Sequence, residues 1–238
     1  MQDICCKLSR TAAVVVLLMV ACVGSAWASG VPWQVGDIVV CYGGGKCNVI
    51  RLHGNTVQLL DTISSGLLGN NGGVGLNNTL HVLATDDGGG GSSKVVVYSI
   101  ASINPFDPTK NPLTHTVIST FNAAGNPGDS AAAVAVSSAG HIFVGNSNAT
   151  GASIVELDAH GTPVTGSTFT FPGAGSCPAT TAISSLDLSA DGSAIYVTVA
   201  DGVIRKVSLA LVTNVYTLAG ASCAQFANFG SALNLNAL

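Results

Sequence analysis

The sequence predicts an all-β protein made of repeated four-stranded antiparallel units, and three observations support this prediction. Short apolar runs with a two-residue period recur between clusters of Gly, Asn, Asp and Ser. No long stretch of the mature region shows the three-to-four spacing of an amphipathic helix. Two segments, 134–144 and 186–197, match each other as a strand, a glycine turn and a second strand. A repeated β unit follows from these features.

Each unit is expected to supply four strands. Weaker copies of the repeated segment occur at 74–83 and, for its second half, at 36–40. Third strands are predicted at 48–52, 94–100, 153–158 and 203–209, and fourth strands at 56–63, 114–121, 168–171 and 214–219. The predicted units are 34–68, 72–122, 131–172, 183–220 and a partial one at 229–238. Four short strands per unit, at spacings of roughly 40 to 60 residues, are typical of propeller blades.

The two ends of the repeat do not decide whether the units close into a ring. The first unit lacks a candidate for its innermost strand, and 230–235 has the pattern of a first strand. Either this last strand completes the first unit, or the ring is incomplete and needs further units. Two inserts, 86–93 and 104–112, are rich in Gly or Pro and are predicted to be loops on the rim.

The N-terminus predicts a secretory signal peptide over 1–28. Lys7 and Arg10 precede an apolar run at 11–22, and Ala26-Trp27-Ala28 supplies the small residues of a cleavage site. The run is shorter than the roughly 20 residues that span a bilayer, and no transmembrane span is expected in the mature chain, 29–238. We therefore expect a secreted or periplasmic bacterial protein that is cleaved near Ala28.

A lipoprotein is the alternative interpretation of this signal. Met19-Val20-Ala21-Cys22 loosely resembles a lipobox, which would leave Cys22 as an acylated N-terminus. Methionine fits the first position of that motif poorly, so ordinary cleavage is favoured.

Four cysteines stay in the mature chain, and disulfides are the default state of cysteine outside the cytosol. They are Cys41, Cys47, Cys177 and Cys223. Four cysteines allow three pairings. Cys177 and Cys223 are each expected in a loop after a fourth strand, and a bridge between these equivalent loops would join adjacent units. Cys41 with Cys47 would then close a small hairpin loop. The Cys-x-x-Cys spacing and the histidine partner of a redox or metal site are missing.

Composition argues against several functions. Charged residues form 8% of the chain, and the few Lys and Arg residues make no dense basic patch, so no nucleic-acid partner is expected. Asp86 and Asp87 lie beside four glycines without the spacing of a calcium loop. Asp129 lies in Gly128-Asp129-Ser130, which resembles a hydrolase nucleophile motif, but alanines follow the serine. These aspartates are weak candidates for ligand loops, and no catalytic residue, metal site or cofactor is predicted.

The segment 186–207 resembles the blade consensus of NHL and YVTN propellers, and it is also similar to blades of the six-bladed, gluconolactonase-like calcium propellers. The resemblance implies that Asp191-Gly192 and Asp201-Gly202 are hairpin turns. It also implies a calcium site with a glutamate ligand in the central channel. Glu156 falls instead in a predicted third strand, which argues against that site.

We therefore expect a binding or scaffold module for an unidentified extracellular ligand or protein, and we favour a non-enzymatic role. The alternatives are a calcium-dependent, gluconolactonase-like hydrolase or lyase, and a cell-surface structural repeat.

Overall fold

The structure is a computed structural model that describes residues 33–34, 36–42, 46–64, 71–76, 82–86, 94–100, 113–120, 130–147, 151–173, 177–180, 182–199 and 202–229. The described residues form fifteen strands in four antiparallel sheets, and no helix occurs among them. The predicted all-β class is therefore confirmed. A helix long and apolar enough to cross a membrane is likewise missing from these ranges.

Each sheet is built from strands that are consecutive in the chain. The first sheet has the order β1-β2-β3, with bounds Ile38–Tyr42, Lys46–His53 and Thr56–Ser64. The second has the order β4-β5-β6-β7, with bounds Asn71–Leu76, Val82–Asp86, Lys94–Ile100 and Leu113–Thr120. The third has the order β8-β9-β10-β11, with bounds Ser130–Val136, Ile142–Ser147, Ser153–Leu157 and Pro163–Thr170. The fourth has the order β12-β13-β14-β15, with bounds Ser185–Leu188, Ala194–Thr198, Val203–Val212 and Val215–Asn228.

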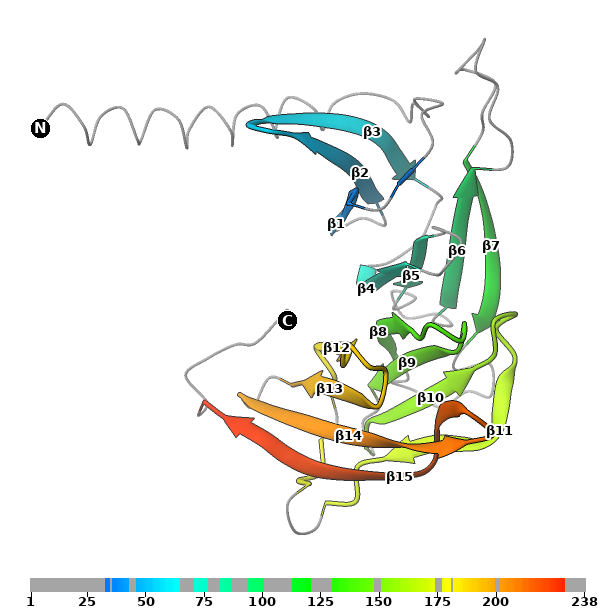
Figure 1. The fold of residues 1–238 in the computed structure, drawn as a ribbon, viewed down its shortest axis with the longest axis vertical. Coiled ribbons are helices and arrows are strands. Elements are labelled where there is room, and N and C mark those ends of the chain that lie inside the picture. The colour runs from blue at the N-terminus through cyan, green and yellow to red at the C-terminus, as the bar shows by residue number, and fades with distance from the viewer. Residues whose placement is uncertain are drawn as a thin grey trace, which may run out of the picture.

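The four sheets follow one another in chain order around an arc (Figure 1). The first sheet lies at one end of the arc and the fourth at the other. The first strand of each four-stranded sheet, β4, β8 or β12, is an edge strand on the inner side of the arc, and the last strand is the other edge. This arrangement matches a propeller-like array of blades whose described part is open on one side.

Apolar residues between successive sheets hold the array together. The alternation of side chains along each strand gives a sheet two apolar faces, one for each neighbour. Between the third and fourth sheets, Phe143 and Ile154 form one fully buried cluster with Ile195 and Val207. Between the second and third sheets, Val95 joins Val134, Val144 and Leu157.

The repeated segment adopts the same turn in the third and fourth sheets. The Ser137 amide donates to the His141 carbonyl, and the Ser137 hydroxyl accepts from the His141 amide. Ser189 makes the equivalent pair of bonds with Ala194, one residue further along. The serine side chain closes the turn in both cases, and the second copy accommodates its inserted residue without losing these bonds.

Several predicted element boundaries were wrong. β11 begins at Pro163 and not at 168, and two further corrections concern candidate site residues. β15 does not end near Ala219 but continues to Asn228, because after a bulge at 218–221 its residues 222–228 pair with residues 203–208 of β14. Cys223 therefore lies inside a strand and not in a loop. β5 includes Asp86, which pairs with Lys94, so this aspartate ends a strand and does not begin the glycine-rich loop.

The first sheet has three strands, as the sequence predicts, with β1 as its inner edge. The proposed last strand at 230–235 lies outside the described residues. A partly buried ion pair holds the start of this sheet: Arg51 Nε and one Nη donate to the two carboxylate oxygens of Asp37 at 2.7 and 2.8 Å. The Arg51 guanidinium is the main reason that the pKa of Asp37 lies below its usual value.

Candidate binding cavity and the contacts that frame it

A cavity of about 270 Å³ lies where the inner strands of three sheets meet. It is lined by residues of β4, β8 and β12: Val74, Gly75, Val134, Ala135, Val136, Ser185, Leu186, Asp187 and Leu188. β4 and β8 can approach closely because β4 carries glycines. A Cβ on Gly73 would lie 2.7 Å from the Cα of Ala133, which is far inside contact distance. The glycine at 73 thus lets β4 pack directly against the backbone of β8 beside this cavity.

The lining combines aliphatic residues with a few polar groups. Five lining residues are Val or Leu, and Asp187 is the one residue of the lining with an ionisable side chain. Asp187 is exposed, and its Oδ1 accepts a bond of 2.8 Å from the Leu188 amide. β8 and β12 are edge strands, and an edge presents backbone N–H and C=O groups to a ligand. The surface of the cavity is more polar than apolar, because lining residues such as Val134 and Leu186 pack their side chains between the sheets. Its volume is below the roughly 300 to 1,000 Å³ of most small-molecule sites.

General acid–base chemistry finds little support in this lining. A hydrolytic site needs a nucleophile with a base in hydrogen-bond reach, or a metal that activates water. Ser185 is the only hydroxyl residue of the lining, and no histidine or second carboxylate accompanies it there. Within the described ranges, no group of three His, Cys, Asp or Glu side chains is placed to hold a metal ion.

Glu156 is fully buried and connects the third sheet to the fourth. Its Oε2 accepts bonds from the Thr217 hydroxyl at 2.6 Å and from the Leu218 amide at 2.8 Å, both in β15. Its Oε1 lies 2.5 Å from His141 Nδ1. Because the Thr217 proton points to Glu156, the bond of 3.1 Å between Ser167 and Thr217 has Ser167 as its donor. Both carboxylate oxygens are therefore engaged, as burial of polar atoms requires.

A bulge in β15 makes this contact possible. The register passes from Ser208↔Ser222 to Ala210↔Thr217, so the β15 residues 218–221 lie opposite a single residue of β14. The Leu218 amide, freed from the ladder, turns to Glu156. This group is not a hydrolase triad, because the carboxylate lies between the imidazole and the hydroxyl, whereas a triad requires the imidazole in that position. It is a structural contact between blades.

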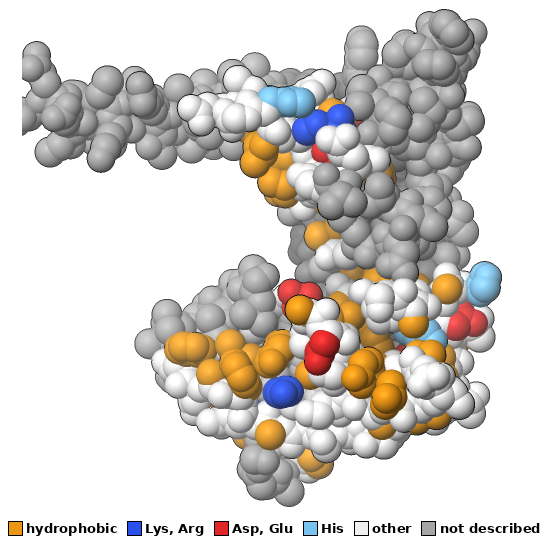
Figure 2. Space-filling model, viewed as in Figure 1, with side chains coloured by type: hydrophobic (Ala, Val, Ile, Leu, Met, Phe, Trp, Pro, Cys, Tyr) orange, Lys and Arg blue, Asp and Glu red, His pale blue; other side chains and the backbone are white. Residues whose placement is uncertain are grey.

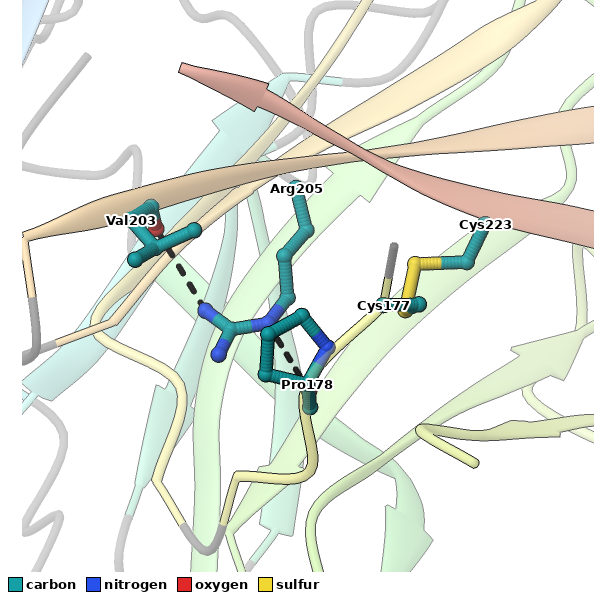
Figure 3. The surroundings of a disulfide bond; sticks show 5 residues. All are labelled: Cys177, Pro178, Val203, Arg205 and Cys223. Carbon is teal, nitrogen blue, oxygen red and sulfur yellow. Dashed lines mark hydrogen bonds between the residues drawn. A yellow bond between two sulfur atoms is a disulfide. The ribbon is translucent and has the colours of Figure 1, made fainter. Parts of the chain in front are cut away.

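The disulfide predicted between adjacent units is present. Cys177 and Cys223 are bonded, with their Cα atoms 5.6 Å apart. Cys177 precedes β12 and Cys223 lies in β15, so the bridge joins the connection between the third and fourth sheets to the outer edge of the fourth (Figure 3). Cys47 is also disulfide-bonded, and its register partner across the β1–β2 hairpin is Cys41. The side chain of Cys41 lies outside the described residues.

Arg205 reinforces the same connection beside the disulfide. Its side chain is fully buried, and its Nε donates to the Pro178 carbonyl at 3.1 Å (Figure 3). An Nη donates to the Val203 carbonyl at 3.4 Å, and the guanidinium lies 6.0 Å from the centre of the Phe171 ring. Arg205 thus contacts both ends of the segment between β11 and Pro178. In the sequence, Arg205 stands out only as one of few positively charged residues. It is buried because side chains alternate along β14, and Arg205 lies on the same face as the buried Val207.

The remaining predicted residues are distributed as follows. Asp191 and Gly192 form the turn between β12 and β13, with Gly192 at φ +73°. Asp191 accepts from the hydroxyls of Ser189 and Ser193 and from the Ser193 amide, and the Ser189 bond is the largest cause that lowers its pKa to about 2. Gly202 has φ +75° at the start of β14. Asp87, Asp129 and Asp201 lie outside the described residues.

The cavity itself is what the sequence analysis missed. The weak ligand candidates were loop aspartates, whereas the cavity is formed by strands Val74–Gly75, Val134–Val136 and Ser185–Leu188. The available signal was that these segments are the first strands of successive units. In a propeller, first strands surround the centre.

Comparisons with known proteins give no family. No protein-family model matches the chain. No curated protein matches it either. Among solved structures, a protein of unknown function from Bacteroides caccae is similar with a TM-score of 0.47 and 13% sequence identity, over 72% of this chain and 53% of that chain. This chain thus spans about half the length of that structure, and a likeness of this degree carries nothing for function.

Proposed function

We propose that this chain is an exported binding module that holds a small ligand in the cavity between β4, β8 and β12. The single observation that carries the proposal is the composition of that cavity, which combines a largely polar surface at three strand edges with one carboxylate residue, Asp187. Such a site favours a small ligand with a cationic or hydrogen-bond-donating group.

Export is part of the proposal. The signal peptide at 1–28, with cleavage near Ala28, takes the protein to an oxidising compartment, where the Cys177–Cys223 bond is stable. The blade pattern of 186–207 supports kinship with NHL and YVTN propellers, whose rings bind diverse partners. The buried Glu156, Arg205 and disulfide contacts make the frame rigid and leave recognition to the cavity.

Three ring compounds of nearly equal size test the head-group preference: benzylamine, benzyl alcohol and benzoate. Isothermal titration at low ionic strength is expected to show benzylamine binding at roughly millimolar affinity, benzyl alcohol more weakly and benzoate not at all. Asp187→Asn should weaken benzylamine by about tenfold, since a hydrogen bond to a charged group contributes on the order of 1.5 to 3 kcal/mol.

Asp191→Asn is the matched control for that substitution. Asp191 is an exposed aspartate of the same sheet, and it is not part of the cavity lining. This variant should bind benzylamine as the parent protein does. Equal binding of benzoate and benzylamine, or an equal loss in both variants, would show that Asp187 does not define the site. A thermal melt with calcium chloride tests the lactonase-like alternative, which requires a calcium-dependent rise in the melting temperature.

A further inference from the structure

The main chain of β12 forms one wall of the cavity. Four consecutive residues of this strand, Ser185–Leu188, line the space. Successive side chains of a strand point to opposite faces of its sheet, so four consecutive residues reach one common space only along the strand's edge. β12 is the inner edge strand of the fourth sheet, and no other described strand pairs with it on that side. Main-chain groups therefore form this wall, which explains why a mostly aliphatic lining has a polar surface.

The strand register shows which main-chain groups of β12 point into the cavity. The Ser189 amide donates to the Ala194 carbonyl at 2.8 Å, so these two residues form a hydrogen-bonded pair. Hydrogen-bonded and non-hydrogen-bonded pairs alternate along an antiparallel ladder. Asp187 is thus hydrogen-bonded to β13, whereas Leu186 and Leu188 occupy non-hydrogen-bonded pairs. The N–H and C=O groups of Leu186 and Leu188 therefore point away from β13, to the side of the cavity.

The Asp187 carboxylate lies at the same edge of β12. The Leu188 amide, one of the groups that point to this edge, donates to Asp187 Oδ1 at 2.8 Å. Figure 2 shows acidic side chains on the inner part of the arc, over the region where Figure 1 places β12. The edge thus offers one donor and one acceptor at Leu186. Two residues further along, it offers a group of acceptors, the Leu188 carbonyl and the Asp187 carboxylate.

We propose that the cavity binds the N-terminus of a short extended peptide, which adds to β12 as an antiparallel strand. This inference rests on the proposed binding function and names the class of its ligand. The third peptide residue lies opposite Leu186 and exchanges both main-chain hydrogen bonds with it. The first peptide residue then lies opposite Leu188, where its ammonium group meets the Leu188 carbonyl and the Asp187 carboxylate. An ammonium group brings the positive charge and the three N–H donors that these acceptors require.

The inner edge of β8 is less suited to the same peptide. A Cβ on Gly75 of β4 would lie 3.4 Å from the Val134 carbonyl oxygen, so β4 runs beside this edge. The residues that β8 contributes to the lining, Val134, Ala135 and Val136, include no carboxylate. The peptide therefore pairs with β12.

Isothermal titration with small alanine peptides tests the ligand class. Trialanine amide is expected to bind about tenfold more tightly than alanine amide, which has the ammonium group but lacks the third residue and its two main-chain bonds. N-acetyl-trialanine amide lacks the ammonium group and should bind about tenfold more weakly than trialanine amide. Benzylamine is titrated in parallel. If benzylamine binds but trialanine amide gains nothing over alanine amide, the peptide proposal fails and the binding function stands. If none of these compounds binds, both fail.

Methylation of the peptide nitrogens gives a matched pair of probes. An N-methyl group on the third residue removes the N–H that donates to the Leu186 carbonyl, and binding should weaken by about tenfold. The second residue lies opposite Asp187 in a non-hydrogen-bonded pair, so its N–H points away from β12. An N-methyl group there should leave the affinity unchanged. Equal effects of the two methyl groups would contradict the proposed pairing.

Amide hydrogen exchange, followed by NMR on the secreted protein, locates the added strand. Saturating trialanine amide is expected to slow exchange of the Leu186 amide by about tenfold or more, because this amide becomes hydrogen-bonded. The amides of Val134 and Val136 in β8 should keep their rates. An unchanged Leu186 amide in the presence of bound peptide, or protection of the β8 amides in its place, overturns the proposal.

Discussion

The Glu156 carboxylate of β10 accepts a hydrogen bond of 2.8 Å from the Leu218 amide of β15, which belongs to the neighbouring sheet. The contact depends on three local features. Glu156 is fully buried, and a bulge in β15 frees the Leu218 amide from the strand pairing. The Thr217 hydroxyl donates a second hydrogen bond to the same carboxylate oxygen. It shows that polar as well as apolar contacts fix the third and fourth sheets relative to each other.

Removal of this carboxylate should destabilise the protein. Glu156→Ala leaves a buried amide and a buried hydroxyl without an acceptor, and we expect a loss of about 2 to 4 kcal/mol in the free energy of unfolding. Thr217→Val removes one of the bonds and should cost about 1 to 2 kcal/mol. Urea denaturation followed by circular dichroism measures both. A loss below about 0.5 kcal/mol for Glu156→Ala, the usual range of surface changes, would mean that the contact is not structural.

Two glycines of β4 form a matched pair for a packing test. A Cβ on Gly73 would meet the Ala133 backbone at 2.7 Å, whereas on Gly75 its nearest neighbour is the Val134 carbonyl oxygen at 3.4 Å. Gly73→Ala is therefore expected to cost about 1 to 3 kcal/mol, since backbone must move. Gly75→Ala should change stability by less than about 1 kcal/mol. Chemical denaturation measures the free energy of unfolding of the two variants. Equal losses in both variants would show that β4 and β8 do not pack this closely.

The strands and their order could be predicted from the sequence, because alternation and turn residues are local signals. The third strand 94–100 was predicted with the bounds of β6, and the three-stranded first unit is present. The end of β15 was missed because residues 218–221 form a bulge, which breaks the alternation, and the pairing then resumes. The β15 residues that Glu156 contacts, Thr217 and Leu218, are 61 and 62 residues distant in sequence, so no local sequence pattern indicates these contacts.

The Cys177–Cys223 bridge was predicted correctly, although one premise of that prediction, a loop position for Cys223, was wrong. Equivalence of the two positions in adjacent units identified the pair, although Cys223 lies in a strand. The cavity could not be predicted from residue types, because its lining is mostly aliphatic and resembles any buried strand. Only the arrangement of three sheets turns those residues toward a common space.

Loss of the Cys177–Cys223 bond should destabilise the chain strongly. The bond closes a segment with a sequence separation of 46, and the chain-entropy relation gives about 4 kcal/mol for a loop of that length. Cys177→Ala with Cys223→Ala is expected to lower the free energy of unfolding by roughly this amount, measured under oxidising conditions. Addition of a thiol reductant to the double variant should then have a smaller effect than on the parent. An unchanged unfolding midpoint in the double variant would contradict this role.

Acid should destabilise the folded state through its hydrogen-bonded aspartates. Bonds from Ser189 and Ser193 lower the pKa of Asp191 to about 2, and the pKa of Asp158 is lowered chiefly by the Thr162 amide. A carboxyl with a folded-state pKa below its unfolded value, about 3.9, contributes stability above that value and loses it as the pH falls toward 2. Urea midpoints should therefore fall between about pH 4 and pH 2. Asp191→Asn should reduce that slope, and an unchanged slope would assign the acid sensitivity elsewhere.

The location of the ligand is tested most directly by amide NMR. During a benzylamine titration of the isotopically labelled secreted protein, the largest shift changes are predicted for the inner strands β4, β8 and β12, including Gly75, Ala135 and Asp187. Asp187→Asn should reduce these changes, and benzoate should not produce them. Shift changes confined to other strands, or none on the inner strands at saturating benzylamine, would contradict a binding site at the centre of the arc.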